Sequence, residues 1–253
     1  MSFLKFNFGT MKQKDSVVVL CGGPSTTTNA GRLKSYIKKN SSVVLSANYN
    51  FYKTIGIKSD YTYITDQLKL FENISLLDSD LIIPIKMKTS MKNAPKVNRA
   101  LTRHRGDIRL YIQRRKPFRI SSYMIGDKQK VSVYKEKRKQ ILMKGNGEFP
   151  YRRLGSAGQG CILLSLVFRP KKILIVGLDG SVPGDISKKK MFDGSTVKYA
   201  SEEKHASVIE FLEVMLFPSM LRLGAKYGTR IETYNSVGFY GLNKKKLGVN
   251  VIG

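Results

Sequence analysis

The chain has 253 residues, with 45 Lys and Arg against 18 Asp and Glu, and a formal net charge of +27. Hydrophobic residues make up 42% of it, enough for a buried core, which excludes general disorder. No apolar run approaches the ~20 residues of a membrane-spanning helix, and residues 1–15 lack the apolar block of a signal peptide. The length fits one domain over residues 1–253, and the charge predicts a polyanionic partner, either nucleic acid or an anionic membrane.

Six short runs rich in β-branched, aliphatic or aromatic residues predict strands, in chain order, at residues 16–21, 43–46, 61–65, 81–85, 172–176 and 231–234. Pro84 marks either the end of the fourth strand or a sheet edge. Helical patterns run through Leu33 and Ile37, from Gly158 through Leu164, and from about Ser201. Strands that alternate with helices predict an α/β fold with a Rossmann-like, mostly parallel sheet flanked by helices.

Residues 85–153 interrupt this pattern and form a basic insertion. From Lys86 to Arg153 there are about 21 Lys and Arg and only four acids, which is roughly +17 of the net charge. Arginines bind phosphates with two parallel hydrogen bonds, and aromatic rings stack on unpaired bases. We therefore expect a nucleic-acid-binding subdomain whose contacts come from Arg99, Arg103, Arg105, Arg109, Arg114, Arg115, Arg119, Tyr111 and Phe118, with Tyr123 close by. A solvated basic surface is the alternative.

Polar or glycine-rich sequences follow several predicted strands. In a parallel sheet these positions share the carboxyl edge, where ligands bind. The first strand ends in Gly22-Gly23-Pro24-Ser25, a turn that lets a ligand approach the backbone and leads into a helix N-terminus. Its spacing matches neither a Walker A loop nor the dinucleotide motif. The other candidates are Asn48, Asp66, Gly158 and Asp179, although each taken singly is also explained by a turn, a cap or packing.

Together these motifs resemble the bacterial CMP-sialic-acid-dependent sialyltransferases. The resemblance rests on CGGPS after the first strand, SANYNFY after the second, TDQLKLFE after the third, and the stretch from Ser156 to Asp179, which is similar to the family's TSG helix and GxDF strand. It covers roughly residues 16–80 and 150–240. Gly22 stands where the family has Asn.

The resemblance implies a nucleotide-sugar-dependent glycosyltransferase that works by direct displacement at the anomeric carbon. Gly22, Gly23, Pro24, Ser25, Asn48, Gly158 and Asp179 would form the site of a donor that is CMP- or UDP-linked, with the sugar undetermined. His205 is the candidate general base, because imidazole titrates near neutrality. Asp66, near the sugar, is the alternative base, and His104 falls among the arginines.

No metal is expected. Asp78-Ser79-Asp80 has the DxD spacing of metal-dependent glycosyltransferases, but it precedes a strand and so lies at the amino edge, away from the ligand crevice. The resembled family works without a metal. Lys188, Lys189, Lys190 or Tyr199 would stabilise the departing phosphate instead.

The sugar site and the basic insertion together favour a glycosyltransferase that modifies 5-hydroxymethylpyrimidine DNA. Such a protein would resemble the phage DNA glycosyl- and arabinosyltransferases in its activity. Two alternatives stay open: a membrane-surface enzyme acting on a lipid-linked glycan, and a non-enzymatic nucleic-acid-binding protein. Cys21 and Cys161 lie in apolar sequence and indicate a reducing compartment, so we expect a cytoplasmic protein, in the host cytoplasm if it is viral. The oligomeric state is left open.

Overall fold

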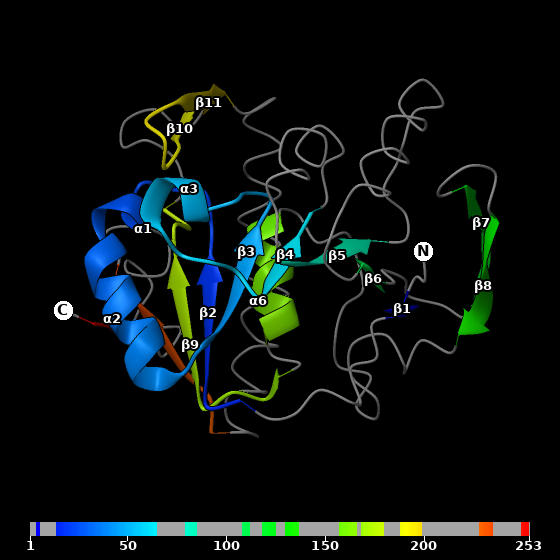
Figure 1. The fold of residues 1–253 in the computed structure, drawn as a ribbon, viewed down its shortest axis with the longest axis horizontal. Coiled ribbons are helices and arrows are strands. Elements are labelled where there is room, and N and C mark those ends of the chain that lie inside the picture. The colour runs from blue at the N-terminus through cyan, green and yellow to red at the C-terminus, as the bar shows by residue number, and fades with distance from the viewer. Residues whose placement is uncertain are drawn as a thin grey trace.

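The computed structural model describes residues 4–5, 14–64, 79–84, 108–111, 118–124, 130–136, 157–165, 168–179, 188–198, 228–234 and 249–252 (Figure 1). In this part of the chain no helix is long and apolar enough to cross a membrane.

A parallel sheet forms the centre of the molecule and confirms the predicted Rossmann-like α/β class. All six predicted strands are present: β2 (Ser16–Leu20), β3 (Val43–Ala47), β4 (Tyr61–Tyr63), β5 (Asp80–Pro84), β9 (Lys172–Val176) and β12 (Arg230–Thr233). Every residue of β2 and β3 is buried, which explains why their sequences are continuous apolar runs rather than alternating ones.

Three further strands complete the described sheet: β1 (Leu4–Lys5), β6 (Ile108–Tyr111) and β13 (Val249–Val251). The strand order is β1-β6-β5-β4-β3-β2-β9-β12-β13, and all neighbours pair in parallel. β5 has a neighbour on each side, so Pro84 marks the end of a strand and not a sheet edge. β6 comes from the basic segment, and part of that segment therefore belongs to the main sheet.

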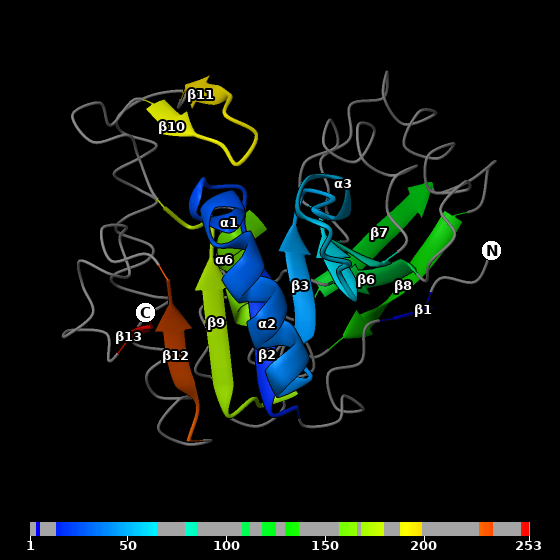
Figure 2. The same ribbon diagram turned by 60° about the vertical axis from the view of Figure 1, so that its left-hand side comes forward.

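Helices cover both faces of the sheet (Figure 2). On one face lies α2 (Ala30–Asn40), whose buried Leu33 packs with Val18, Val44 and Leu174. On the other lies α6 (Ala157–Ser165), which contacts β2, β3 and β4. Both helices were predicted from the sequence; the one expected from about Ser201 lies outside the described residues.

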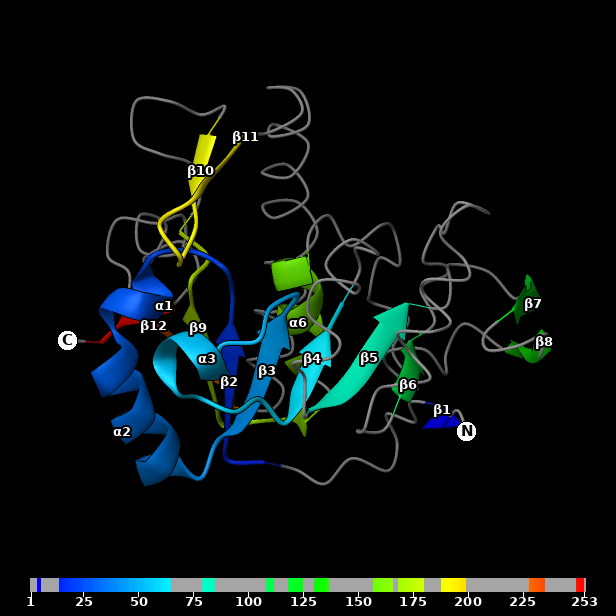
Figure 3. The same ribbon diagram turned by 45° about the horizontal axis from the view of Figure 1, so that its top comes forward.

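Two short helices and two antiparallel hairpins extend from these layers. The helices α1 (Ser25–Thr28) and α3 (Tyr52–Ile55) follow β2 and β3. The first hairpin pairs β10 (Lys188–Lys190) with β11 (Thr196–Lys198), and it lies beyond the carboxyl ends of the central strands (Figure 1). The second, β7 (Phe118–Met124) with β8 (Lys130–Glu136), lies at the end of the sheet that carries β6 (Figure 3).

Candidate functional site

The candidate site lies at the carboxyl edge of the sheet, where β2 and β9 end side by side. From β2 the chain builds outward through β3, β4, β5 and β6 on one side, and it returns to β9 on the other side of β2. Open α/β sheets bind their ligands at the carboxyl edge beside such a reversal of strand order. Gly22–Ser25 follows β2, and Gly177–Asp179 follows β9.

The two loops are joined by hydrogen bonds across this point. The Gly23 N–H donates to the Gly177 carbonyl at 2.8 Å, and the Gly177 N–H donates to the Ser25 hydroxyl oxygen at 2.9 Å. Ser25 donates to the Asp179 carboxylate twice, from its N–H at 2.7 Å and from its hydroxyl at 2.5 Å. Two segments about 154 positions apart thus form one structural unit.

The glycines of this unit are required by the close approach of the loops. A Cβ on Gly23 would lie 2.5 Å from an Asp179 carboxylate oxygen and 2.6 Å from the Gly177 carbonyl oxygen. Gly177 has φ +79°, a left-handed conformation that side chains disfavour. The sequence analysis assigned the Gly22–Ser25 turn to a ligand. The structure describes its contact with the chain's own Asp179, and its role toward a ligand stays a prediction.

Asp179 also sets the electrostatics at the start of α1. Its carboxylate accepts both Ser25 hydrogen bonds at the helix N-terminus, where the sequence analysis placed a phosphate. A second anion next to this carboxylate would be repelled. The position therefore favours a neutral hydroxyl group of a ligand, and phosphates would have to lie farther from Asp179.

Gly158 lies behind the same edge, in the first turn of α6. A Cβ there would lie 2.9 Å from the Cys21 sulfur and 3.1 Å from a Leu178 methyl carbon. A Cβ on Gly160 would collide with the Tyr63 ring. These small residues let α6 pack directly onto the strand ends. Cys21 and Cys161 are buried free thiols, and burial raises the pKa of Cys161.

Asn48 terminates β3 at the same edge. Its φ of +65° is left-handed, a conformation that Asn tolerates better than most residues, and its N–H donates to the Tyr63 carbonyl at 2.9 Å. This hydrogen bond joins the ends of β3 and β4. The chain then turns back toward the Gly22 turn through Tyr49.

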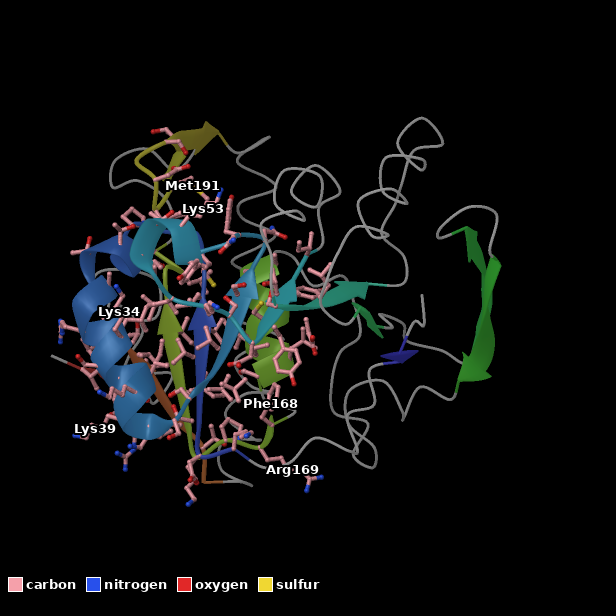
Figure 4. All side chains as sticks on the ribbon, viewed as in Figure 1. Lys34, Lys39, Lys53, Phe168, Arg169 and Met191 are labelled. Atoms are coloured by element: carbon pink, nitrogen blue, oxygen red, sulfur yellow. The ribbon has the colours of Figure 1, made fainter. Side chains whose placement is uncertain are left out.

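The β10–β11 hairpin packs against the Gly22 turn, a contact that the sequence analysis missed. The Phe192 N–H donates to the Gly22 carbonyl at 2.8 Å, and the Thr27 hydroxyl donates to the Phe192 carbonyl at 2.7 Å. The Phe192 ring lies 5.2 Å from that of Tyr49 and 5.1 Å from that of Phe51. A Cβ on Gly22 would meet Met191 and Tyr49 (Met191 is labelled in Figure 4).

A local signal for this hairpin was present in the sequence. Asp193-Gly194 is a hairpin-turn dipeptide, and Gly194 has φ +84°. Lys188, Lys189 and Lys190, which the sequence predicts to stabilise the departing phosphate, form the first strand of this hairpin. The contact of Phe192 with the Gly22 turn had no such local signal.

The remaining predicted site residues are only partly described. Arg109 and Tyr111 lie in β6, and Phe118, Arg119 and Tyr123 lie in β7. The following lie outside the described residues: Arg99, Arg103, Arg105, Arg114, Arg115, His104, His205, Asp66, Asp78 and Tyr199. Asp80 begins β5 and so lies at the amino edge, as predicted. The described residues contain no cluster of three or more His, Cys, Asp or Glu that would hold a metal ion.

Comparison with known proteins gives a likeness in fold. The sequence matches no protein-family model and no curated protein. Among solved structures, the MAf glycosyltransferase from Magnetospirillum magneticum AMB-1 is similar, with a TM-score of 0.51 and 12% sequence identity. The match covers 92% of this chain but only 33% of that protein, so the chain spans about a third of its neighbour's length.

Proposed function

We propose that the protein is a glycosyltransferase that transfers a sugar from a CMP- or UDP-linked donor to the hydroxyl of a 5-hydroxymethylpyrimidine in DNA. The observation that carries the proposal is the joining of Gly22–Ser25 to Gly177–Asp179 at the point where the strand order reverses. The similar MAf structure belongs to a glycosyltransferase, which supports sugar transfer as the general activity. The net charge of +27 supports a polyanionic acceptor.

The donor would lie at the carboxyl edge of the sheet, beside the joined β2 and β9 loops. Asp179 favours a hydroxyl group beside it, such as one of the nucleotide ribose or of the sugar. The donor phosphates would lie on the side of the β10–β11 hairpin, because its strand Lys188–Lys190 consists of three lysines. Charge neutralisation there would favour departure of the nucleotide.

The acceptor would be held by the basic segment 85–153. Arginines of this segment would contact phosphates, and Tyr111, Phe118 or Tyr123 would stack on an extruded base. His205, or alternatively Asp66, would accept the proton of the hydroxymethyl group. Its oxygen would bond to the anomeric carbon as the bond from that carbon to the donor phosphate breaks.

The decisive experiment is a donor screen on paired DNA duplexes, one unmodified and one hydroxymethylated. Digested nucleosides are analysed by mass, and we expect a hexose- or pentose-sized increase only on the hydroxymethylated nucleoside. Transfer to a lipid-linked glycan instead would overturn the DNA acceptor. An absence of transfer together with no thermal stabilisation by any donor would overturn the glycosyltransferase assignment.

The catalytic assignment is tested with His205→Ala, matched by His104→Ala. We expect His205→Ala to reduce turnover by at least 100-fold while donor binding is retained, and His104→Ala to retain turnover. Near-normal turnover of His205→Ala would transfer the base role to Asp66.

A further inference from the structure

A cluster of exposed cations lies at the amino edge of the sheet, opposite the candidate site. It is formed by the starts of β2, β9 and β12 and by the last turn of α2. We call it the amino-edge surface, and its exposed members are Lys14, Lys38, Lys39, Arg169, Lys171 and Arg230. Lys172 lies among them but is half-buried and donates to the Asn40 side chain. Lys39 and Arg169 are labelled at the foot of Figure 4, on the side away from Lys53 and Met191.

The backbone brings these cations into fixed neighbouring positions. Arg230 pairs in register with Lys172, and Lys172 pairs with Ser16, so the Arg230 and Lys172 side chains leave the same face of strands about 4.8 Å apart. The loops before the strands are also joined, because the Arg230 N–H donates to the Lys171 carbonyl at 2.6 Å. Like charges this close repel each other unless an anion is present.

Among the described residues, cations outnumber carboxylates at this end of the sheet. Asp15 forms an exposed ion pair with Lys171 at 2.8 Å. Glu232, two residues after Arg230 in β12, is buried and accepts a hydrogen bond from the Tyr36 hydroxyl. Asp60 accepts a hydrogen bond from the Val44 N–H in β3, and Asp80 begins β5. The negative end of the α2 dipole favours cations, but this effect accounts only for Lys38 and Lys39 in the last turn of that helix.

Arg169 places an exposed charge of this surface on a constrained backbone position. It has φ +46°, in the left-handed region that glycine prefers, and it is exposed between buried Phe168 and Pro170. An arginine in this conformation is destabilised relative to glycine. Replacement by glycine therefore removes the charge without straining the backbone.

We propose that the amino-edge surface binds the phosphates of nucleic acid, as a second contact separate from the basic segment 85–153. We favour nucleic acid over a membrane, because amphipathic membrane-binding surfaces place apolar side chains beside their cations. Among the described residues the exposed large hydrophobic side chain is Tyr52, which lies on α3 near the opposite edge. This proposal does not depend on sugar transfer.

The test compares two triple variants that each remove three exposed positive charges. The edge variant combines Lys14→Gln, Arg169→Gly and Arg230→Gln. The control variant combines Lys34→Gln, Lys53→Gln and Lys58→Gln, on α2, on α3 and in the loop after it. Binding to a fluorescent unmodified 20-base-pair duplex is measured by anisotropy from 50 to 200 mM KCl, without donor.

We expect the edge variant to bind about tenfold more weakly than the parent protein at 100 mM KCl. The salt slope, which is the slope of the logarithm of the binding constant against the logarithm of the KCl concentration, should decrease in magnitude by roughly 2 to 3, because each lost phosphate contact removes about 0.9 from it. We expect the control variant to stay within about threefold of the parent protein. Equal weakening of both variants would show an effect of net charge alone and overturn the proposal, as would unchanged binding of the edge variant.

Two further measurements complete the test. If the edge variant unfolds at a lower temperature than the parent protein, Arg169→Gly alone is used, because glycine fits the backbone there. It should lower the slope by about 0.9, and an unchanged slope would count against the surface. The parent protein and the edge variant are also mixed with vesicles that contain 30% phosphatidylserine. If the edge variant loses vesicle binding but keeps duplex binding, the partner of this surface is a membrane and the proposal is wrong. Because the duplex is unmodified and no donor is present, failure here leaves the sugar-transfer assay unaffected.

Discussion

At the scale of single residues, the candidate site depends on glycines that bring the chain's own loops together. Gly23 precedes α1 and Gly31 lies in the first turn of α2, and the space around these two glycines differs. A Cβ on Gly23 meets Asp179 and Gly177, whereas a Cβ on Gly31 meets nothing within 4 Å. The same substitution should therefore have opposite effects at the two positions.

Gly23→Ala should lower the free energy of unfolding by about 2 kcal/mol, because the Asp179 carboxylate must move away from Ser25. Gly31→Ala should raise it by roughly 0.5–1 kcal/mol, because alanine favours the helix. Urea denaturation measures both changes. A Gly23→Ala protein that unfolds at the parent's urea concentration would contradict the described contact.

The half-buried Tyr36 of α2 and the buried Glu232 of β12 form a polar pair. The Tyr36 hydroxyl donates to the Glu232 carboxylate at 2.7 Å, and Glu232 is only 6% exposed. Burial, and then the Glu232 carboxylate, raise the pKa of Tyr36 above its ordinary value of about 10. The hydrogen bond therefore stabilises the fold fully below pH 10, and the contribution is lost as the pH rises from there toward the raised pKa.

Tyr36→Phe should destabilise the protein by about 1–2 kcal/mol at pH 8, because a buried carboxylate loses its donor. The difference between variant and parent should shrink as the pH rises above 10. Urea midpoints at pH 8, 9, 10 and 11 give the comparison. A difference that stayed constant or grew across that range would rule out the assigned titration.

At the scale of elements, the β10–β11 hairpin is held at the Gly22 turn by two apolar side chains. Phe192 packs against Tyr49 and Phe51, and its backbone bonds to Gly22 and Thr27. Met191 beside it is also buried, whereas the turn at Asp193–Ser195 is exposed. Removal of the Phe192 ring should therefore weaken the attachment of the hairpin.

Phe192→Ala should increase the rate of trypsin cleavage at Lys188–Lys190 and Lys198 about tenfold. Loss of the buried ring removes roughly 1.5 kcal/mol of stabilisation, and this raises the fraction of molecules whose hairpin is detached from the Gly22 turn about tenfold. Cleavage sites are identified by peptide mass. Tyr52→Ala, at a half-exposed ring on α3, is the control and should cleave at the parent rate. Equal rates for all three proteins would show that the hairpin is held by other contacts.

At the scale of the whole molecule, the charge excess dominates the electrostatics. Part of it lies in residues 85–153, and another part lies at the amino edge of the sheet. A net charge of +27 repels itself more strongly in the compact state than in the unfolded chain. The stability of the fold should therefore depend on ionic strength.

The melting temperature should rise by a few degrees between 20 and 200 mM NaCl, because the Debye length falls from about 20 to about 7 Å over this range. Calorimetry at constant pH measures the shift. Equimolar sucrose, which carries no charge, is the control and should have a much smaller effect. A melting temperature that falls with added salt would mean that attractive ion pairs outweigh the repulsion.

The amino-acid sequence by itself determined the six central strands, the helices α2 and α6, and the glycine-rich turn after β2. These features depend on short apolar runs and turn residues that act locally, because a strand buried on both faces must be apolar along its whole length. The position of Gly158 at the start of a helix followed from the same kind of local pattern.

Only the tertiary structure decided which of these pieces meet. Ser25 and Asp179 bond across 154 positions, Phe192 packs over the Gly22 turn, and β6 joins the sheet from within the basic segment. The register that aligns Arg230 with Lys172 is likewise absent from any local pattern. Contacts between distant segments arise from strand order and packing, and neither periodicity nor composition encodes them within one segment.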